Sequence, residues 1–168
     1  MEQTVSDELE VVRCTLDLSE PCRLPFRGAR NISAPKSETV DLEFRDGKVF
    51  QDGREIVLFL SEEQKKGLTK GFEILRLMES TEVPVSAKLL DLFLEREELW
   101  PEEWKRDGRG RTLYVFFWGD LFGGLDRNMP FVRCGYWDMV DRKVREDTFW
   151  LCDSWNGSHP ATVLKKPF

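Results

Sequence analysis

The only histidine of the chain, His159, follows closely after Cys152 and Asp153. These three residue types can form a nucleophilic site, in which the imidazole takes the thiol proton and a carboxylate orients the imidazole. Asp120 is a second candidate for that carboxylate. The turn-rich loop 156–160 allows His159 to return over the end of the preceding strand. A single loop histidine is more often a surface residue, so we predict no catalytic residues and keep Cys152, His159 and Asp153 as the alternative.

The single histidine also limits the metal chemistry of the chain. HExxH and Cys2His2 zinc sites need two histidines, and the four cysteines lack the CxxC spacing of a zinc ribbon. There is no GxxxxGK[ST] phosphate loop and no GxSxG elbow. Aspartates follow several expected strands, where oxygens can hold a cation, but aspartate is foremost a turn residue. These aspartates are Asp120, Asp126, Asp138, Asp141, Asp147 and Asp153. The sequence therefore predicts no metal and no cofactor.

Two cysteines fall on neighbouring strands of an expected C-terminal hairpin. With its turn centred near residues 142 and 143, opposed positions sum to about 285. Cys134 and Cys152 meet this condition and are predicted to lie opposite each other. The sequence leaves open whether they are two buried apolar side chains or a redox-sensitive pair.

Aromatic side chains concentrate in the second half of the chain, where all 6 Trp lie at or after Trp100. Strand alternation places Tyr114, Phe116 and Trp118 on one face of their strand and other apolar residues on the opposite face. Large rings on both faces mean that both faces are covered or that one binds a partner. We therefore predict a binding surface on this sheet. Its residues are Trp118, Trp137, Trp150, Trp155 and Asn156.

The chain has 168 residues, of which 33% are charged and 40% are hydrophobic, as is typical of a globular protein. Net charge −6 and a pI near 5.0 argue against a nucleic-acid binder, which usually has a basic face. The N-terminal residues do not resemble a secretory signal, and no apolar run is long enough to span a bilayer. We expect a cytoplasmic protein with no membrane partner.

The N-terminal half predicts strands and then helices. A strand is expected over residues 9–18, followed by an irregular connection. Two Asp-Gly pairs indicate hairpin turns, and they predict a meander of residues 40–44, 48–51 and 54–60. A capping box of Ser61 and Gln64 begins a helix with a buried stripe. The stripe consists of Leu68, Phe72 and Leu75, flanked by Ile74 and Met78. Gly67 and Gly71 within it indicate either close packing or a broken helix.

A second helix is expected after Ser86, with Leu89, Leu90, Phe93 and Leu94 buried. Aromatic and β-branched residues then predict strands over 112–118, 131–137 and 147–155. The predicted fold class is α+β: an N-terminal β-meander, two central helices and an aromatic-rich, three-stranded antiparallel C-terminal sheet. We expect residues 1–39 to form an N-terminal strand and irregular segment, and residues 40–168 to form one domain.

Several segments together resemble a small family of bacterial proteins with a "PEEWK…FFWG…WN…PA" pattern near the C-terminus. The matching segments are LFLSEEQKKG (58–67), WPEEWK (100–105), FFWG (116–119), WN (155–156) and PA (160–161). The similarity covers residues 56 to 164, and the chain departs from the family in a longer basic insert before Thr112. The family has no assigned activity, so the resemblance implies a bacterial or phage-borne cytoplasmic protein.

The sequence favours a non-catalytic binding or interaction protein that uses its Trp-rich sheet. The partner is a protein or a small ligand that the sequence does not identify. Two alternatives stay open: a small hydrolase using His159 with Cys152 or Asp153, and a carbohydrate-binding module.

Overall fold

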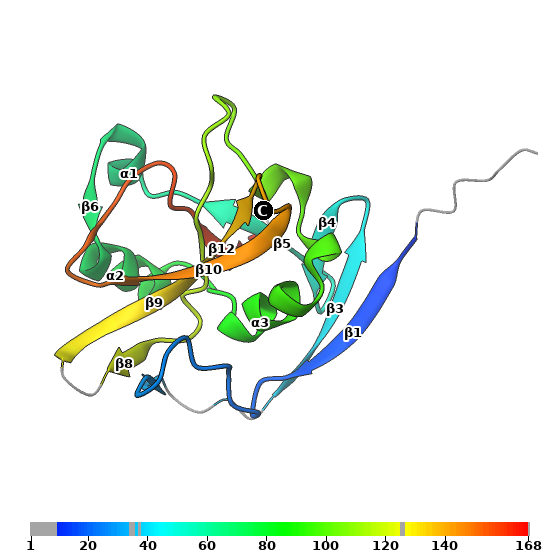
Figure 1. Cartoon of the computed structure of the whole chain (residues 1–168), viewed down its shortest axis with the longest axis horizontal. Helices are drawn as coiled ribbons and strands as arrows, with labels where there is room; N and C mark the ends of the chain where they lie inside the picture. The colour runs from blue at the N-terminus through cyan, green and yellow to red at the C-terminus, as the bar shows by residue number, and fades with distance from the viewer. Residues whose placement is uncertain (1–9, 34–35, 37, 125–126, 168) are drawn as a thin grey trace, which may run out of the picture.

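The structure, a computed structural model, describes residues 10–33, 36, 38–124 and 127–167. Within these residues the fold is mixed α/β, with three α-helices and a predominance of strands (Figure 1). The helices are α1 (Glu62–Lys66), α2 (Gly71–Ser80) and α3 (Ala87–Glu95), and 3₁₀ turns lie at Glu97–Leu99 and Glu102–Trp104. The strands are β1 (Val12–Asp17), β2 (Arg30–Asn31), β3 (Thr39–Arg45), β4 (Lys48–Gln51), β5 (Arg54–Phe59), β6 (Thr69–Lys70), β7 (Val115–Phe116), β8 (Phe122–Gly124), β9 (Arg127–Asp138), β10 (Lys143–Trp150), β11 (Ser154–Trp155) and β12 (Ala161–Leu164).

Most strands join one 10-stranded sheet, in the order β1-β3-β4-β5-β12-β7-β9-β8-β2, with β10 paired to β9. β6 and β11 form a separate pair. Strand β12 lies between β5, to which it is antiparallel, and β7, to which it is parallel. It therefore connects the N-terminal meander and the C-terminal strands into one sheet. The predicted three-stranded C-terminal sheet is instead part of this larger sheet, because residues 161–164, to which no strand was assigned, pair with both β5 and β7.

The N-terminal meander forms as predicted. β3, β4 and β5 match the expected ranges to within one residue at each end. Both Asp-Gly pairs adopt positive φ, with 54° and 73° at Asp46-Gly47 and 50° and 82° at Asp52-Gly53. This backbone twist is the one that a two-residue hairpin loop needs.

The helix predicted from Ser61 is broken into two. The capping box is confirmed: Gln64 N donates to Ser61 Oγ and Ser61 N donates to Gln64 Oε1, both at 3.1 Å. Helix α1 ends at Lys66, the chain runs extended through β6, and α2 begins at Gly71. A Cβ at Gly71 would lie 2.6 Å from the Trp155 ring, so this glycine also permits close packing.

The break changes which residues α2 buries. Leu68 and Phe72 were predicted to be core residues, but they are 67% and 46% exposed. Ile74 and Met78, the predicted flanks, are buried instead. The physical reason is that a helix starting at Gly71, which itself faces Trp155, presents positions 71, 74 and 78 to the sheet. For α3, the predicted burial of Leu89, Leu90 and Phe93 is confirmed, and Leu94 is partly buried.

The β9–β10 hairpin has a different register from the predicted one. Asp138 lies opposite Lys143, and Cys134 lies opposite Asp147. The turn occupies residues 139–142, where Asp138 accepts hydrogen bonds from the N–H groups of Val140 and Asp141. Cys152 lies beyond the end of β10 and is exposed, whereas Cys134 is buried. The predicted opposition of Cys134 and Cys152 is therefore wrong.

The sheet has a core on each face. Helix α3 packs on the face that carries Phe131 and Gly135 of β9, which we call the α3 face. Helix α2 packs on the face that carries Val132 and Cys134, which we call the α2 face. Because side chains alternate along a strand, β9 and β10 contribute to both.

Candidate functional site

The four tryptophans of the predicted binding surface do not lie on one surface. Trp118 and Trp155 lie in the core of the α2 face, with their ring centroids 5.5 Å apart, and only 3% and 0% of them is exposed. Trp137 and Trp150 are partly buried against the core of the α3 face. The prediction is therefore wrong for Trp118 and Trp155, because α2 covers the half of the sheet on which they lie. Asn156 is exposed and organises a turn, in which its Oδ1 accepts from Ser158 N at 2.8 Å.

The candidate catalytic residues His159 and Asp153 form hydrogen bonds with backbone N–H groups and not with each other. His159 Nδ1 accepts a hydrogen bond of 2.9 Å from Asn156 N, and Asp153 Oδ2 accepts one of 2.8 Å from Trp150 N. Burial lowers the pKa of His159, so the imidazole is neutral, with its proton on Nε2. In the described part of the chain no hydrogen bond joins His159 to Cys152 or Asp153.

A different group of rings meets on the part of the α2 face beyond helix α2. Tyr114, which precedes β7, lies with its ring centroid 5.0 Å from Tyr136 of β9 and 5.7 Å from His159. His159 lies 5.0 Å from Phe149 of β10. All four side chains are partly buried, and neighbouring rings are inclined by 44° to 61°. We call these four residues the aromatic surface.

The aromatic surface is neutral, with charge at its margin. Burial, and next the neighbouring Tyr114, raise the pKa of Tyr136, so its hydroxyl group keeps its proton. Asp147 shares the face of Phe149 and is exposed. Arg145, on the same face, donates to Asp138 Oδ2 at 2.5 Å through its Nε. Rings with an apolar body and a polar tip suit contact with another molecule.

The α3 face carries a buried ion cluster instead. Arg133 of β9 is 0% exposed, and its Nη2 lies 2.8 Å from both Asp91 Oδ1 of α3 and Glu146 Oε2 of β10. Asp91 Oδ2 also accepts from Arg23 N at 2.9 Å. Burial raises the pKa of Asp91 although Arg133 opposes the shift. We call Arg133, Asp91 and Glu146 the Arg133 cluster.

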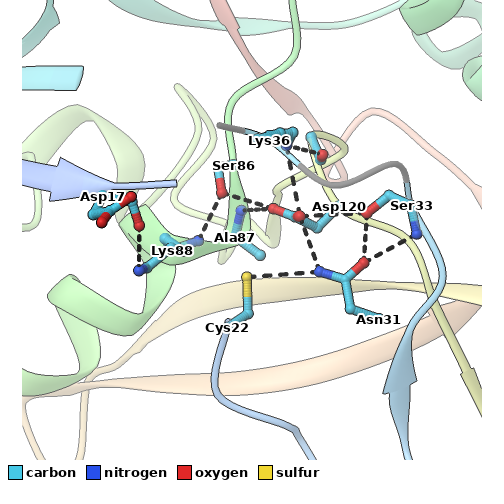
Figure 2. Close-up of polar contacts among 10 residues, drawn as sticks. Asp17, Cys22, Asn31, Ser33, Lys36, Ser86, Ala87, Lys88 and Asp120 are labelled. Atoms are coloured by element: carbon cyan, nitrogen blue, oxygen red, sulfur yellow. Dashed lines mark hydrogen bonds and ion pairs between the residues drawn. The ribbon is translucent and has the colours of Figure 1, made fainter. Parts of the chain in front are cut away.

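Asp120 joins the segment between β1 and β3 to the start of α3 (Figure 2). Its Oδ2 accepts from Ser86 Oγ at 2.7 Å and from Ala87 N at 2.9 Å. Its Oδ1 accepts from Asn31 Nδ2 at 3.1 Å and lies 3.5 Å from Lys36 Nζ. Burial alone would raise the pKa of Asp120, but these hydrogen bonds and the lysine charge bring it below its ordinary value.

A cavity of about 190 Å³ lies beside Asp120, with Cys22 in its wall. Burial, and next the carboxylates of Asp120 and Asp91, raise the pKa of Cys22 to about 12. The thiol is therefore protonated at neutral pH and is a poor nucleophile. The arrangement around Asp120 pairs its buried carboxylate and holds Asn31 and Lys36 close to the start of α3.

Of the aromatic surface, the sequence singles out Tyr114 and His159 but not Tyr136 and Phe149, because the position of α2 decides which rings stay accessible. Arg133 gave a usable indication: a lone arginine between apolar strand residues needs a buried carboxylate partner. Asp91 lies among the apolar residues of α3 and gave the complementary indication.

Together these features define a mixed α/β protein with one ion-paired sheet face and one partly accessible aromatic face. No protein-family model matches the chain, and comparisons with curated proteins and with solved structures also give no match. Among the described residues, no three side chains of His, Cys, Asp or Glu are grouped to hold a metal ion. No helix in the described ranges is both long and apolar enough to cross a membrane.

Proposed function

We propose that this protein is a non-catalytic binding protein whose partner docks on the aromatic surface. The observation that supports the proposal is the meeting of Tyr114, Tyr136, Phe149 and His159 on a part of the sheet where none of them is fully buried. Tyrosine provides a large contact area at a small cost in conformational entropy, and it is enriched among residues that dominate binding energy. A protein surface is the partner that such rings suit best.

The position of these rings is fixed before a partner arrives. Phe149 contacts the buried rings of Phe116 at 5.0 Å and Trp155 at 5.3 Å, so the core holds it. His159 is held by the hydrogen bond from Asn156 N. Side chains that are already ordered lose less entropy on binding, which favours affinity.

The two alternatives have less support from the geometry. A hydrolase needs the imidazole to contact its nucleophile, whereas the hydrogen-bonded Nδ1 of His159 faces Asn156. A carbohydrate platform needs exposed indoles, but Trp118 and Trp155 are buried and Trp137 has the Lys105 ammonium 3.8 Å from its ring centroid. A cytoplasmic location and a bacterial or phage origin remain part of the proposal.

The test is affinity capture from a lysate of the source organism, read by native mass spectrometry. We expect the wild-type protein to retain a stoichiometric component, and the double variant Tyr114→Ser/Tyr136→Ser to retain it at least about tenfold less. The matched control is Phe72→Ser, which removes an exposed ring from α2, outside the aromatic surface.

Retention of the component by the double variant, or its equal loss from Phe72→Ser, would contradict the proposal. A wild-type protein that carries no component would also count against it. Far-UV circular dichroism of each variant shows whether the fold is preserved.

A further inference from the structure

Strand β1 is the outermost strand at one end of the sheet (Figure 1). Among the described strands it pairs only with β3. Its side chains alternate: Val12, Cys14 and Leu16 pack partly against the core, whereas Arg13 and Thr15 are exposed. Strand β10, which pairs only with β9 among the described strands, is a second edge strand with which the outer edge of β1 can be compared.

The outward backbone groups of β1 belong to Arg13 and Thr15. Leu18 N donates to Glu38 O at 2.9 Å, and these two residues lie opposite each other in the β1–β3 register. The even-numbered residues of β1 therefore form hydrogen-bonded pairs with β3, and the backbone groups of the odd-numbered residues point away from β3. Asp41, opposite Thr15, accepts from Asp52 N at 2.8 Å and thus directs its carbonyl away from β1. Both observations place the N–H and C=O groups of Arg13 and Thr15 on the outer edge.

Aspartates block the C-terminal half of the outer edge of β10. Leu151 N donates to Pro130 O at 2.9 Å, so the even-numbered residues of β10 point outward. Of these, Thr148 N donates to Asp147 Oδ1 and Trp150 N donates to Asp153 Oδ2, both at 2.8 Å. No carboxylate accepts from the Arg13 or Thr15 amide within the described residues. Proteins commonly block edge strands that must not pair, so an open edge needs another explanation.

We propose that β1 is a dimer interface, in which the β1 strands of two copies of this chain pair antiparallel about a twofold axis at Cys14. Arg13 of one copy then lies opposite Thr15 of the other, and their outward groups form four N–H···O bonds across the interface. Val12 lies opposite the second copy's Leu16, so the half-buried apolar faces become continuous. The dimer extends the sheet across both copies.

The register follows from the residues themselves. Shifting the strands so that Arg13 meets Arg13 places like charges opposite each other, which is destabilising. The shift in the other direction pairs Arg13 with Asp17, whose carbonyl already accepts from Glu20 N at 3.2 Å and Lys88 Nζ at 2.5 Å. Of these three registers, only the one centred on Cys14 avoids both the contact of Arg13 with Arg13 and the occupied carbonyl of Asp17. Because the overlap is short, the dimer is weak and forms at micromolar or higher concentration.

The first test is sedimentation equilibrium over a range of concentrations, with Thr15→Pro and Thr15→Val. Proline removes the outward N–H without affecting the β3 ladder, and edge strands tolerate it. Both variants lose the Thr15 Oγ1 hydrogen bond to Asp41, so they differ in the outward amide and in the proline ring but not in this bond. We expect the dissociation constant to rise by about thirtyfold in Thr15→Pro and to stay near the wild-type value in Thr15→Val. A wild-type protein that is monomeric at all concentrations, or a Thr15→Pro dimer as tight as the wild type, overturns the proposal.

The second test uses Cys14 as a register marker and does not depend on a proline variant folding. In a Cys152→Ser background, copper–phenanthroline oxidation takes two electrons and two protons from a pair of thiols and forms one disulfide. Residues opposite each other in a non-hydrogen-bonded pair are close enough for that bond. We expect a covalent dimer from this variant and none from Cys14→Ser/Cys152→Ser.

A thiol at Arg13 is the control for the register. The triple variant Arg13→Cys/Cys14→Ser/Cys152→Ser carries its thiol on the opposite side of the strand, facing Thr15 of the second copy. We expect it to cross-link at least about tenfold more slowly than Cys14. Equal cross-linking at both positions, or none at Cys14, contradicts the proposed pairing.

Discussion

The two faces of the central sheet are stabilised in different ways. On the α3 face, Arg133 is fully buried between the carboxylates of Asp91 and Glu146. On the α2 face, the contact between helix and sheet is apolar and close, with Gly71 against the Trp155 ring. The same strand, β9, contributes to both faces through alternate side chains.

The difference places the buried ion cluster and the proposed binding surface on opposite faces of the sheet. Buried ion pairs have strict geometric requirements, so the α3 face and the N-terminal segment joined to it through Arg23 and Asp120 are fixed. Among the residues that the structure describes, the α2 face has no such cluster, and beyond α2 its rings remain partly accessible. A partner can bind there without breaking a buried charge pair.

The largest effect is expected from Arg133→Ala. This substitution leaves the Asp91 and Glu146 carboxylates without their buried cation, which costs about 3–5 kcal/mol of the free energy of unfolding. Urea denaturation at pH 7, followed by tryptophan fluorescence, measures the change.

Arg145→Ala is the matched control on the α2 face. Arg145 pairs with Asp138 and Asp141 at the exposed end of the same hairpin. Water screens surface pairs of this kind, so we expect a much smaller loss of stability than in Arg133→Ala. Comparable losses in the two variants would mean that the two faces do not differ in the way described above.

Gly71→Ala tests the apolar contact of the α2 face. The added Cβ would lie 2.6 Å from the Trp155 ring and 2.8 Å from the Leu151 backbone, so the helix must move away from the sheet. Overpacking of this kind costs about 1–3 kcal/mol. Gly67→Ala is the control, since apart from its chain neighbours no described residue has an atom within 4 Å of a Cβ there. A Gly71→Ala protein as stable as Gly67→Ala would show that α2 does not pack closely, and the melting temperature of each variant decides this.

The features that the sequence predicted well are local. An Asp-Gly turn requires only positive φ at adjacent residues, and the Ser61–Gln64 capping box requires only one helical turn. The features that the sequence predicted wrongly depend on contacts between residues that are far apart in the sequence. Gly71 fixes the start of α2 through Trp155, far along the chain, and Leu68 and Phe72 consequently become exposed.

The candidate site was predicted in part. The aromatic content indicated strands in the C-terminal region, but β7 and β10 differ from the expected ranges 112–118 and 147–155. The tryptophans were the expected binding residues because of their size. Burial selects against them: the largest rings, Trp118 and Trp155, fill the core, and the smaller Tyr114 and Tyr136 remain at the surface. The Arg133 cluster joins α3, β9 and β10, so no single segment of sequence could reveal it.

The smallest effect concerns acid stability, and Asp120→Asn is the variant that measures it. The native pKa of Asp120 is below its ordinary value, so the contribution of the ionised form is complete above the unfolded pKa, about 3.9, and is lost as the pH falls through the native pKa. We expect Asn to cost about 1–2 kcal/mol at pH 7, and the difference from wild type to shrink below about pH 4.

The free energy of unfolding also depends on pH through His159, which lies on the α2 face. Its native pKa lies below the ordinary 6.5, so its neutral form contributes stability that is lost as the pH falls from near 6.5 through the native pKa. Wild type and Asp120→Asn share this loss, and they also share the opposing effect of Asp91, whose raised pKa favours the native state at low pH. Urea midpoints of both proteins from pH 7 to pH 3 therefore isolate Asp120. A difference that stays constant down to pH 3 would show that the carboxylate charge of Asp120 does not hold the N-terminal segment to α3.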